Sequence, residues 1–170
     1  MNPMREIKVA KVTLNMGVGA DAAKLDGSMR LLERITGHKP IKTSSMKRIP
    51  SWGVRPKLPI ACMVVVRGED AITLLKRLFE SVDFKIPIKK FDKTGNFSFG
   101  IAEYINILGV EYDVELGIVG MNIAVTLERP GYRVSKKLIR SAKIGIKHRI
   151  SQQEAIDFIK QKFNVEVLEE

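Results

Sequence analysis

Hydrophobic positions near the start of the chain alternate with polar ones and then change to a helical spacing. Between residues 7 and 15 apolar side chains occupy every second position, but the phase shifts at Ala10, which predicts a strand with a bulge. Between Asp21 and Gly37 the apolar residues recur every three or four positions. Asp21 is a suitable N-cap and Gly37 a suitable C-terminal stop, so a helix is predicted between these two residues.

The rest of the chain mixes strand and helix patterns without a regular strand-helix rhythm. Helices are predicted at 69–82 and, behind a capping-box sequence at 151–154, near the C-terminus, with Asn164 as the stop. Residues 104–120 are irregular. The fold class predicted is α+β, with a mainly antiparallel sheet, helices packed against it, long basic loops and a C-terminal capping helix. Further strands are predicted at 41–43, 60–67, 86–91, 97–101, 123–127 and 165–168, and the strand at 60–67 is apolar on both faces, which indicates a central position.

The composition argues against secretion, a metal cluster and a membrane span. Cys62 is the only cysteine, and with only His38 and His148 beside it no zinc cluster can be assembled. The longest apolar run, at 58–66, contains Pro59 and is far shorter than the ~20 residues that a membrane helix needs. The first residues lack the apolar stretch of a signal peptide. We therefore expect a cytoplasmic protein with no cofactor.

Basic residues are concentrated in two acid-free tracts. Residues 34–68 and 129–153 contain no Asp or Glu, and each holds eight Lys or Arg. The rest of the chain has 13 basic against 19 acidic residues, although the whole chain carries a net charge of +10. Such segregation suits the displacement of counterions from a phosphate backbone, so nucleic acid is the leading partner class. Prolines interrupt both tracts, which disfavours the continuous amphipathic helix that binding to a lipid surface would require.

No group of residues forms a complete catalytic or nucleotide-binding motif. Gly17 and Gly19 follow a strand and precede a helix, but the third glycine of the dinucleotide fingerprint is missing, and Asp21 would place a carboxylate where the phosphate belongs. The glycine pair is either a structural turn or a turn that lets the backbone approach RNA. Cys62 lies in an apolar run that raises the pKa of its thiol, and neither histidine has a carboxylate nearby to orient it. We expect no enzymatic activity.

The segment 47–57 places the only tryptophan of the chain among four cations. Two interpretations of Trp52 remain open. It either folds back on the core, or it protrudes and stacks on a base or sugar while the cations contact phosphates. The second tract is likewise either a solvated face or an RNA contact, and eight cations without an acidic residue favour RNA contact.

Several short blocks spread over nearly the whole chain share a known pattern. They are KVTLNMGVG at 11–19, TGHKP at 36–40, PIAC at 59–62, VRG at 66–68, TGNFSFGI at 94–101, GVEYD at 109–113 and GIVGM at 117–121. These blocks resemble the L-five family of large-subunit ribosomal proteins. RPGYR at 129–133 and KHRIS at 147–151 resemble its archaeal and eukaryotic branch, and we favour an archaeal form. The sequence departs from the pattern at Val65, where members of the family often carry a hydroxyl residue.

Carried over by position, the resemblance implies two groups of RNA-binding residues, and the charge of the second basic tract indicates a third. A 5S rRNA surface would comprise Asn15, Met16, Gly17, Thr43, Ser44, Ser45, Lys47 and Arg67. A loop close to tRNA would comprise Arg48, Ser51, Trp52, Gly53, Arg55 and Lys57. Contacts to other rRNA would comprise Arg129, Arg133, Lys136, Lys137, Lys143, Lys147, His148 and Arg149.

The same resemblance implies a structural constituent of the large ribosomal subunit. It would bind 5S rRNA and help attach it to the large-subunit rRNA in the central protuberance, beside neighbouring ribosomal proteins of that region. It would also contact a small-subunit head protein in an intersubunit bridge and lie near P-site tRNA. We expect one RNA-binding domain over 1–170, with a core at 1–128 and a basic arm and final helix at 129–170. The alternative is an RNA-processing enzyme or a free RNA chaperone; neither a membrane nor a small-molecule substrate is expected.

Overall fold

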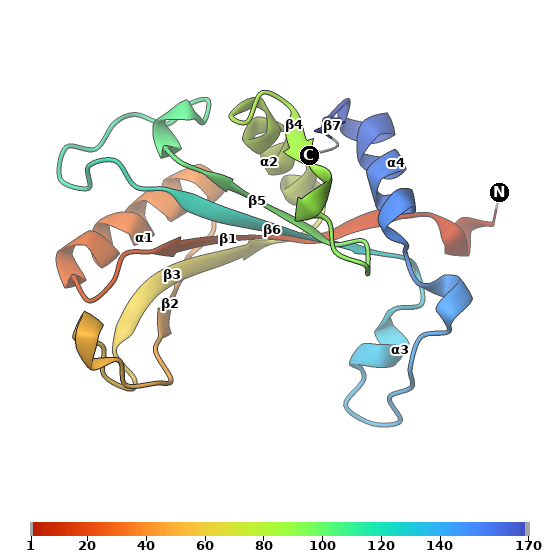
Figure 1. Cartoon of the computed structure of the whole chain (residues 1–170), viewed down its shortest axis with the longest axis horizontal. Helices are drawn as coiled ribbons and strands as arrows, with labels where there is room; N and C mark the ends of the chain where they lie inside the picture. Colours follow the sequence, from red (N-terminus) through yellow and green to blue (C-terminus); the bar gives the residue numbers. More distant parts are fainter. Residues whose placement is uncertain (1, 169–170) are drawn as a thin grey trace.

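A five-stranded antiparallel sheet forms the centre of the fold. Its strands are β1 (Lys8–Gly17), β2 (Ile41–Ser44), β3 (Pro59–Val66), β5 (Phe97–Ile101) and β6 (Met121–Glu128). The computed structural model describes residues 2–168, and Figure 1 shows how the elements are arranged. The strand order is β2-β3-β1-β6-β5, so the N-terminal strand occupies the middle of the sheet and pairs with both β3 and β6.

Helices pack against one face of this sheet. They are α1 (Ala22–Thr36), α2 (Glu69–Glu80) and α4 (Gln152–Phe163), and a short helix α3 (Arg133–Lys136) lies away from the sheet. Two short strands, β4 (Lys85–Pro87) and β7 (Glu166–Leu168), form a separate parallel pair. The predicted α+β class with a mainly antiparallel sheet and a C-terminal helix is therefore confirmed. Single 3-10 turns occur at Pro3–Arg5, Pro50–Trp52, Ile88–Lys90, Tyr104–Asn106 and Ile146–His148.

The predicted ends of α1 and α4 are confirmed, because the capping residues form the hydrogen bonds that their side chains allow. The Asp21 carboxylate accepts hydrogen bonds from the backbone N–H groups of Ala23 and Lys24, and Gly37 ends α1 in the left-handed conformation with φ 68°. At α4 the Ser151 and Glu154 side chains form a complete capping box. The predicted bulge in β1 is also present, as a register shift between Val9 and Lys11.

The hydrophobic core lies between the sheet and the helices. Along β1, Val12, Leu14 and Met16 have no exposed surface, whereas the residues between them are half-buried on the other face. Phe79 of α2 lies at the centre of an aromatic group, with its ring centroid 5.5 Å from that of Phe99 and 5.3 Å from that of Phe163. The final helix therefore belongs to the same core as the central sheet.

Some of the observed elements differ from the predicted ones in length or in burial. The strand predicted at 86–91 covers only Lys85–Pro87, and a 3-10 turn follows it because Pro87 has no N–H to continue a ladder. The helix predicted at 69–82 ends at Glu80. The strand predicted at 60–67 is an interior strand, as expected, but one of its faces stays half-exposed instead of fully buried.

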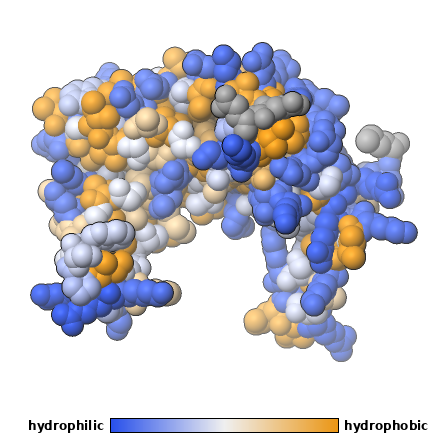
Figure 2. All heavy atoms as spheres, in the orientation of Figure 1, coloured by the Kyte–Doolittle hydropathy of each residue, from blue (hydrophilic) through white to orange (hydrophobic). Residues whose placement is uncertain are grey.

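Two segments project from the molecule on the same side, opposite α2 and α4 (Figure 1). The first is the connection between β2 and β3 at 45–58, here called the hairpin loop. The second runs from 129 to 150 between β6 and α4, here called the basic arm. Figure 2 shows that the molecule is hollowed between them and that strongly hydrophilic atoms line the outer edges of both projections.

Candidate nucleic-acid interface

The face of the sheet away from the helices, here called the open face, carries mainly small and polar side chains. Lys11, Thr13 and Asn15 lie on this face of β1, because the residues between them are buried against the helices. Few of these side chains are bulky, so a phosphate backbone can approach the sheet closely. The strand register adds Ile41 and Thr43 from β2, Ala61, Met63 and Val65 from β3, Asn122, Ala124, Thr126 and Glu128 from β6, and Ser98 and Gly100 from β5.

Asn15 lies in the middle strand of the open face, in register with Met63 on one side and Asn122 on the other. Gly17 ends the same strand and is exposed, and a Cβ atom added there would meet no atom within 4 Å. Met16 points the opposite way and is fully buried. Although Met16 was predicted with the 5S rRNA surface, its side chain belongs to the core, because the alternation of a strand sends every second residue to the helices.

The other residues predicted for the 5S rRNA surface lie near one of the two ends of β3, either on the paired strand β2 and the hairpin loop or after the last residue of β3. Thr43, Ser44 and Ser45 lie at the end next to the hairpin loop, where the Ser45 hydroxyl donates a hydrogen bond of 2.8 Å to the carbonyl oxygen of Lys47. Arg67 is exposed but follows the opposite end of the strand. The structure therefore brings most of the group together and leaves Arg67 apart from it.

The hairpin loop is closed by backbone hydrogen bonds. Ile49 and Val54 exchange N–H···O bonds of 2.9 and 3.1 Å, and the N–H of Lys57 donates to the carbonyl oxygen of Ser45 at 2.8 Å. Val54 turns inward and is buried, whereas Trp52 is 73% exposed on the 3-10 turn. Of the two interpretations of this tryptophan, the structure therefore supports the protruding one.

The predicted tRNA-proximal residues share this loop. Ser51 and Gly53 lie on the exposed turn beside the tryptophan, and Gly53 has a positive φ of 64° that closes the turn. Within residues 2–168 no carboxylate lies within 4 Å of any of the four loop cations. The loop therefore presents unneutralised positive charge around an exposed aromatic ring; the cations are Lys47, Arg48, Arg55 and Lys57.

Arg129 forms the base of the basic arm. Its side chain is only 6% exposed and bonds to Glu154 at 2.7 Å. The same guanidinium donates to the carbonyl oxygens of His148 and Arg149 at 3.3 and 3.2 Å. Arg129 was predicted to contact rRNA, but these bonds hold both of its terminal nitrogens inside the protein, so it ties the end of the arm back to its start.

Tyr132 and His148 complete this attachment. The Tyr132 hydroxyl accepts a 3.0 Å hydrogen bond from the N–H of Ile150 and donates to the carbonyl oxygen of His148. His148 Nε2 donates a hydrogen bond to the carbonyl oxygen of Pro130 at 2.9 Å. The rings of Tyr132 and His148 also make an edge contact. His148 is therefore half-buried and holds the arm together, although the sequence predicted it among the rRNA contacts.

The remaining predicted residues of the arm are exposed. Lys136 pairs with Glu128 of β6, and Arg149 Nε donates to the carbonyl oxygen of Ile144 at 3.3 Å. Arg140 is also exposed but was not among the predicted site residues, even though its place in the acid-free tract signalled it. The exposed members of the predicted group are Arg133, Lys136, Lys137, Lys143, Lys147 and Arg149.

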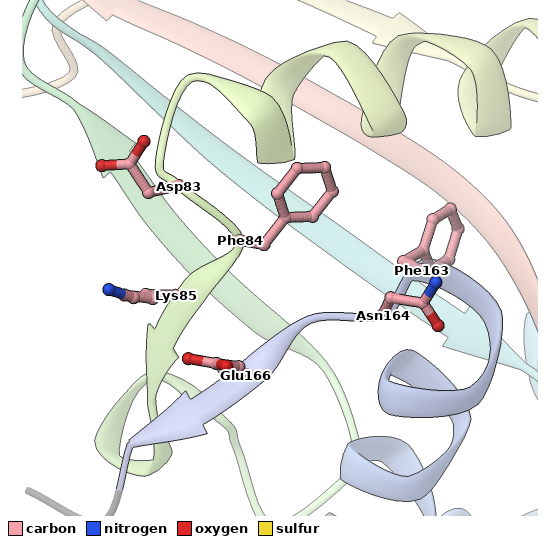
Figure 3. A pocket seen from close by; sticks show the side chains of 6 residues that line it. All are labelled: Asp83, Phe84, Lys85, Phe163, Asn164 and Glu166. Carbon is pink, nitrogen blue, oxygen red and sulfur yellow. The ribbon is translucent and has the colours of Figure 1, made fainter.

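A pocket of about 480 Å³ lies where β4 and β7 meet. Figure 3 shows the side chains of Asp83, Lys85 and Glu166 extending together away from Phe84 and Phe163. No histidine, cysteine or hydroxyl residue lines it. Among residues 2–168 no cluster of three metal-ligating side chains occurs, and no helix there has the length and hydrophobicity to cross a membrane.

Cys62 behaves as a small core residue. It has no exposed surface, and burial raises the pKa of its thiol to about 11. A thiol with this pKa is protonated at neutral pH, so Cys62 is not activated as a nucleophile.

Sequence reasoning missed most of the open face. Lys11, Thr13, Asn122 and Thr126 come from two strands far apart in sequence and become neighbours only through pairing. The alternation within each strand was visible in the sequence, but alternation does not tell which strands pair or in which register. The hairpin loop was found because its charge and its tryptophan are local features.

The open face and the two acid-free projections beside it define a basic α+β protein suited to folded RNA. The projections carry no carboxylates that would repel the phosphates of the RNA. Comparison with known proteins agrees with this class. The family described as "Ribosomal protein L5" matches residues 2–55, and the model for the C-terminus of the same ribosomal protein family matches residues 59–158.

Individual relatives match over the full length. The protein "Large ribosomal subunit protein uL5" of Nanoarchaeum equitans is 47% identical over 168 residues, covering 98% of this chain and 99% of its own length. The protein of the same name from Methanobrevibacter smithii is 41% identical and covered completely, as is this chain. That of Sulfolobus acidocaldarius is 43% identical, covering 99% of this chain and 94% of its own length. The chain belongs to the ribosomal protein L5 family, which confirms the resemblance found in the sequence.

Proposed function

We propose that this chain binds 5S rRNA with the open face of its sheet and the adjoining residues of β2, and helps attach 5S rRNA to the large-subunit rRNA in the central protuberance. Membership of the family makes the chain a structural constituent of the large ribosomal subunit, associated with its rRNA and proteins on the ribosome, and not an enzyme. The proposal that the open face binds 5S rRNA rests on one observation. An open face of mainly small and polar side chains lies between two acid-free projections on the same side of the molecule (Figure 1).

The chemistry of the open face supports binding to folded RNA. Asn15 and Asn122 offer amide groups that can both donate and accept hydrogen bonds, and Thr13 and Thr43 offer hydroxyls. These groups suit bases and 2′-hydroxyls that are accessible in bulges and loops. Val65 lies on the same face, so the missing hydroxyl noted in the sequence is a missing polar group of this surface.

The hairpin loop is the part that we propose approaches P-site tRNA. Trp52 can stack on a base or a sugar, and the surrounding cations can contact phosphates. The backbone bonds between Ile49 and Val54 reduce the entropy that ordering this loop on RNA would cost.

The contact with a small-subunit head protein fits a different surface. Residues 103–118 carry exposed Glu103, Glu111 and Glu115 together with exposed Tyr112 and Val114. Carboxylates would repel the phosphates of RNA, whereas a basic protein surface with apolar side chains would complement them. We therefore propose this segment for the protein contact of the intersubunit bridge.

The alternative, a free RNA chaperone, differs from the proposed function in its expected selectivity among RNAs. A chaperone would bind RNAs of equal length with similar affinity, since its contacts would be to the phosphate backbone alone. The proposed function instead requires preference for 5S rRNA that survives moderate salt. An RNA-processing enzyme is the other alternative, and it would need turnover of RNA by the purified chain.

The salt dependence of RNA binding tests the role of the hairpin loop. Single Arg48→Ala, Arg55→Ala and Lys57→Ala variants are expected to lower the slope of log affinity for tRNA against log salt by about one unit each, because each removes one phosphate contact. Lys76→Ala on α2, which is exposed on the helical side, is the matched control and should leave the slope unchanged. If the three loop variants behave like the control, the loop is not part of the RNA interface.

A further inference from the structure

The outer part of the basic arm exposes large aliphatic side chains that nothing within residues 2–168 covers. Leu138 is 99% exposed, Ile146 84% and Ile139 76%. A single exposed aliphatic residue needs no explanation, but three within nine positions on one projection form a small apolar surface. We call residues 134–147 the tip of the arm.

The base of the arm prevents these side chains from folding back on the core. Arg129 is bonded to Glu154 and to two carbonyl oxygens of the returning chain, and Tyr132 bonds to His148 and Ile150. Farther out, the N–H of Ala142 donates to the carbonyl oxygen of Val134 at 3.2 Å, which links the two sides of the tip. The arm is thus held away from the body of the protein (Figure 1), and its aliphatic side chains stay exposed.

The charge around these aliphatic residues indicates their partner. The tip has five exposed cations, and one of them, Lys136, pairs with Glu128 at the base of the arm. Within residues 2–168, no carboxylate lies within 4 Å of the other four. A partner that covers the aliphatic residues must therefore also accept several positive charges. The four cations are Lys137, Arg140, Lys143 and Lys147.

We propose that the tip of the basic arm binds unpaired nucleotides of rRNA, with Leu138 and Ile139 packed against the faces of unstacked bases while the surrounding cations bind the flanking phosphates. This inference rests on the proposed function, since it presumes that the chain binds RNA. It assigns to the arm a selectivity that phosphate contacts alone do not provide. Stacked bases in a continuous A-form duplex hide their faces, so the aliphatic side chains require a bulge, a loop or a junction.

The architecture favours RNA over an acidic protein as the occupant. The hairpin loop on the same side of the molecule has the same composition, an exposed apolar side chain at Trp52 among unpaired cations. Both projections border one hollow (Figure 2), so one folded RNA can contact both. Apolar side chains that enter a nucleic acid between bases are a known way to convert a phosphate contact into a contact that depends on base stacking.

Two RNA hairpins provide a direct test. One is fully paired, and the other has the same sequence with a bulge of a few unpaired nucleotides, one of them 2-aminopurine. The full-length protein is expected to bind the bulged hairpin more tightly and to change its fluorescence. A Leu138→Ser/Ile139→Ser variant should lose about tenfold in affinity for the bulged hairpin, a loss that partial burial of two aliphatic side chains can produce, and almost none for the paired one. Its salt slope should be unchanged because no cation is removed.

A matched control makes a similar change outside both projections. Met4→Ser/Leu168→Ser replaces two exposed apolar residues, 54% and 41% exposed, that belong to neither projection, and this variant should bind both hairpins as the unchanged protein does. If the tip variant binds the bulged hairpin as tightly as the unchanged protein, the proposal for the tip is wrong and an acidic protein becomes the better occupant, while RNA binding by the rest of the chain still stands. If the unchanged protein binds neither hairpin nor any rRNA, both the tip and the proposed function fail.

Discussion

Gly95 is a residue where a family motif has a structural explanation. It lies in the TGNFSFGI block, has a positive φ of 78°, and a Cβ atom added to it would lie 2.5 Å from Ile150 Cγ2. Ile150 is fully buried where the basic arm rejoins α4. The glycine therefore allows the turn before β5 to pack against the base of the arm.

Replacement of Gly95 by alanine should destabilise the protein by about 2 kcal/mol or more, since the left-handed conformation alone costs ~1 kcal/mol for alanine and the contact with Ile150 adds to it. Urea unfolding of the purified protein measures this difference. Gly145→Ala is the matched control, because φ there is −57° and nothing lies within 4 Å of an added Cβ atom. Equal stability of the two variants would contradict the packing described here.

Asn15 is the residue through which the open face can be tested. Asn15→Ala should weaken binding to 5S rRNA by roughly 1–3 kcal/mol, because an RNA polar group would be left unpaired in the interface. Asn15 is half-buried and makes no side-chain hydrogen bond within residues 2–168, so the substitution should leave the fold intact. Full affinity in a variant with unchanged stability would remove Asn15 from the 5S rRNA surface. Asn122 of β6 lies opposite Asn15 in register, so Asn122→Ala shows whether the loss of affinity for 5S rRNA extends from β1 to β6.

Single residues could be predicted where their role is local and not where it depends on pairing. Asp21, Gly37 and Ser151 were identified as caps because a cap involves only neighbouring backbone groups. Arg129 was placed among the RNA contacts because its sequence neighbours are basic, but its partner Glu154 lies 25 positions further along the chain. The side chain of Met16 lies in the core because it alternates with two surface residues of the same strand.

At the scale of elements, the capping box of α4 also anchors the basic arm. Glu154 accepts a hydrogen bond from the N–H of Ser151, and its other oxygen accepts one from Arg129. These interactions, with the bond from the Ser151 backbone the largest, lower the pKa of the Glu154 carboxyl below its ordinary value. The start of the helix and the base of the arm are thus stabilised by one ionised side chain.

The arm should therefore loosen in acid. Because the pKa of Glu154 is lower in the folded state than in the unfolded state, its contribution is fully present above the ordinary glutamate pKa of about 4.3 and is lost as the pH falls through the lower folded value. Hydrogen-exchange protection of residues 145–155 should fall over this range before the protection of β1 does.

Glu154→Gln should reproduce part of this change at neutral pH, with a loss of about 1–2 kcal/mol because a charged hydrogen bond becomes a neutral one. Trypsin should then cleave the arm faster than in the unchanged protein. Asp157→Asn on the same helix is the control, since Asp157 is exposed and has no ion pair within the described residues. Unchanged cleavage of the Glu154→Gln variant would show that the arm is held by other contacts.

Elements were predictable to the extent that periodicity marks them. The strands β1, β5 and β6 and the helices α1 and α4 show clear alternation or helical spacing, and all are present. Strand β4 was overestimated because the apolar residues after Pro87 continue the pattern while the backbone turns. The closed form of the hairpin loop was not predicted, since the hydrogen bonds between Ile49 and Val54 leave no periodic signal.

At the scale of the whole molecule, the acid-free tracts and the acidic segment of the sequence lie on separate parts of the structure. The two acid-free tracts are about 60 residues apart in sequence, yet both supply a projection on the side away from the helices (Figure 1). The acidic segment at 103–118 lies outside both projections. The chain thus has one region suited to RNA and another suited to protein, as a component that joins RNA and protein in one assembly requires.

We propose that this molecule selects 5S rRNA and does not merely bind polyanions. The most direct test is a titration of the purified protein against 5S rRNA, an unrelated RNA of similar length and tRNA, at low and at moderate salt. We expect preference for 5S rRNA that persists at moderate salt, because hydrogen bonds from the open face add to the salt-sensitive phosphate contacts. Equal affinity for all three RNAs, lost together as salt rises, would contradict the account and leave only a general basic RNA-binding protein.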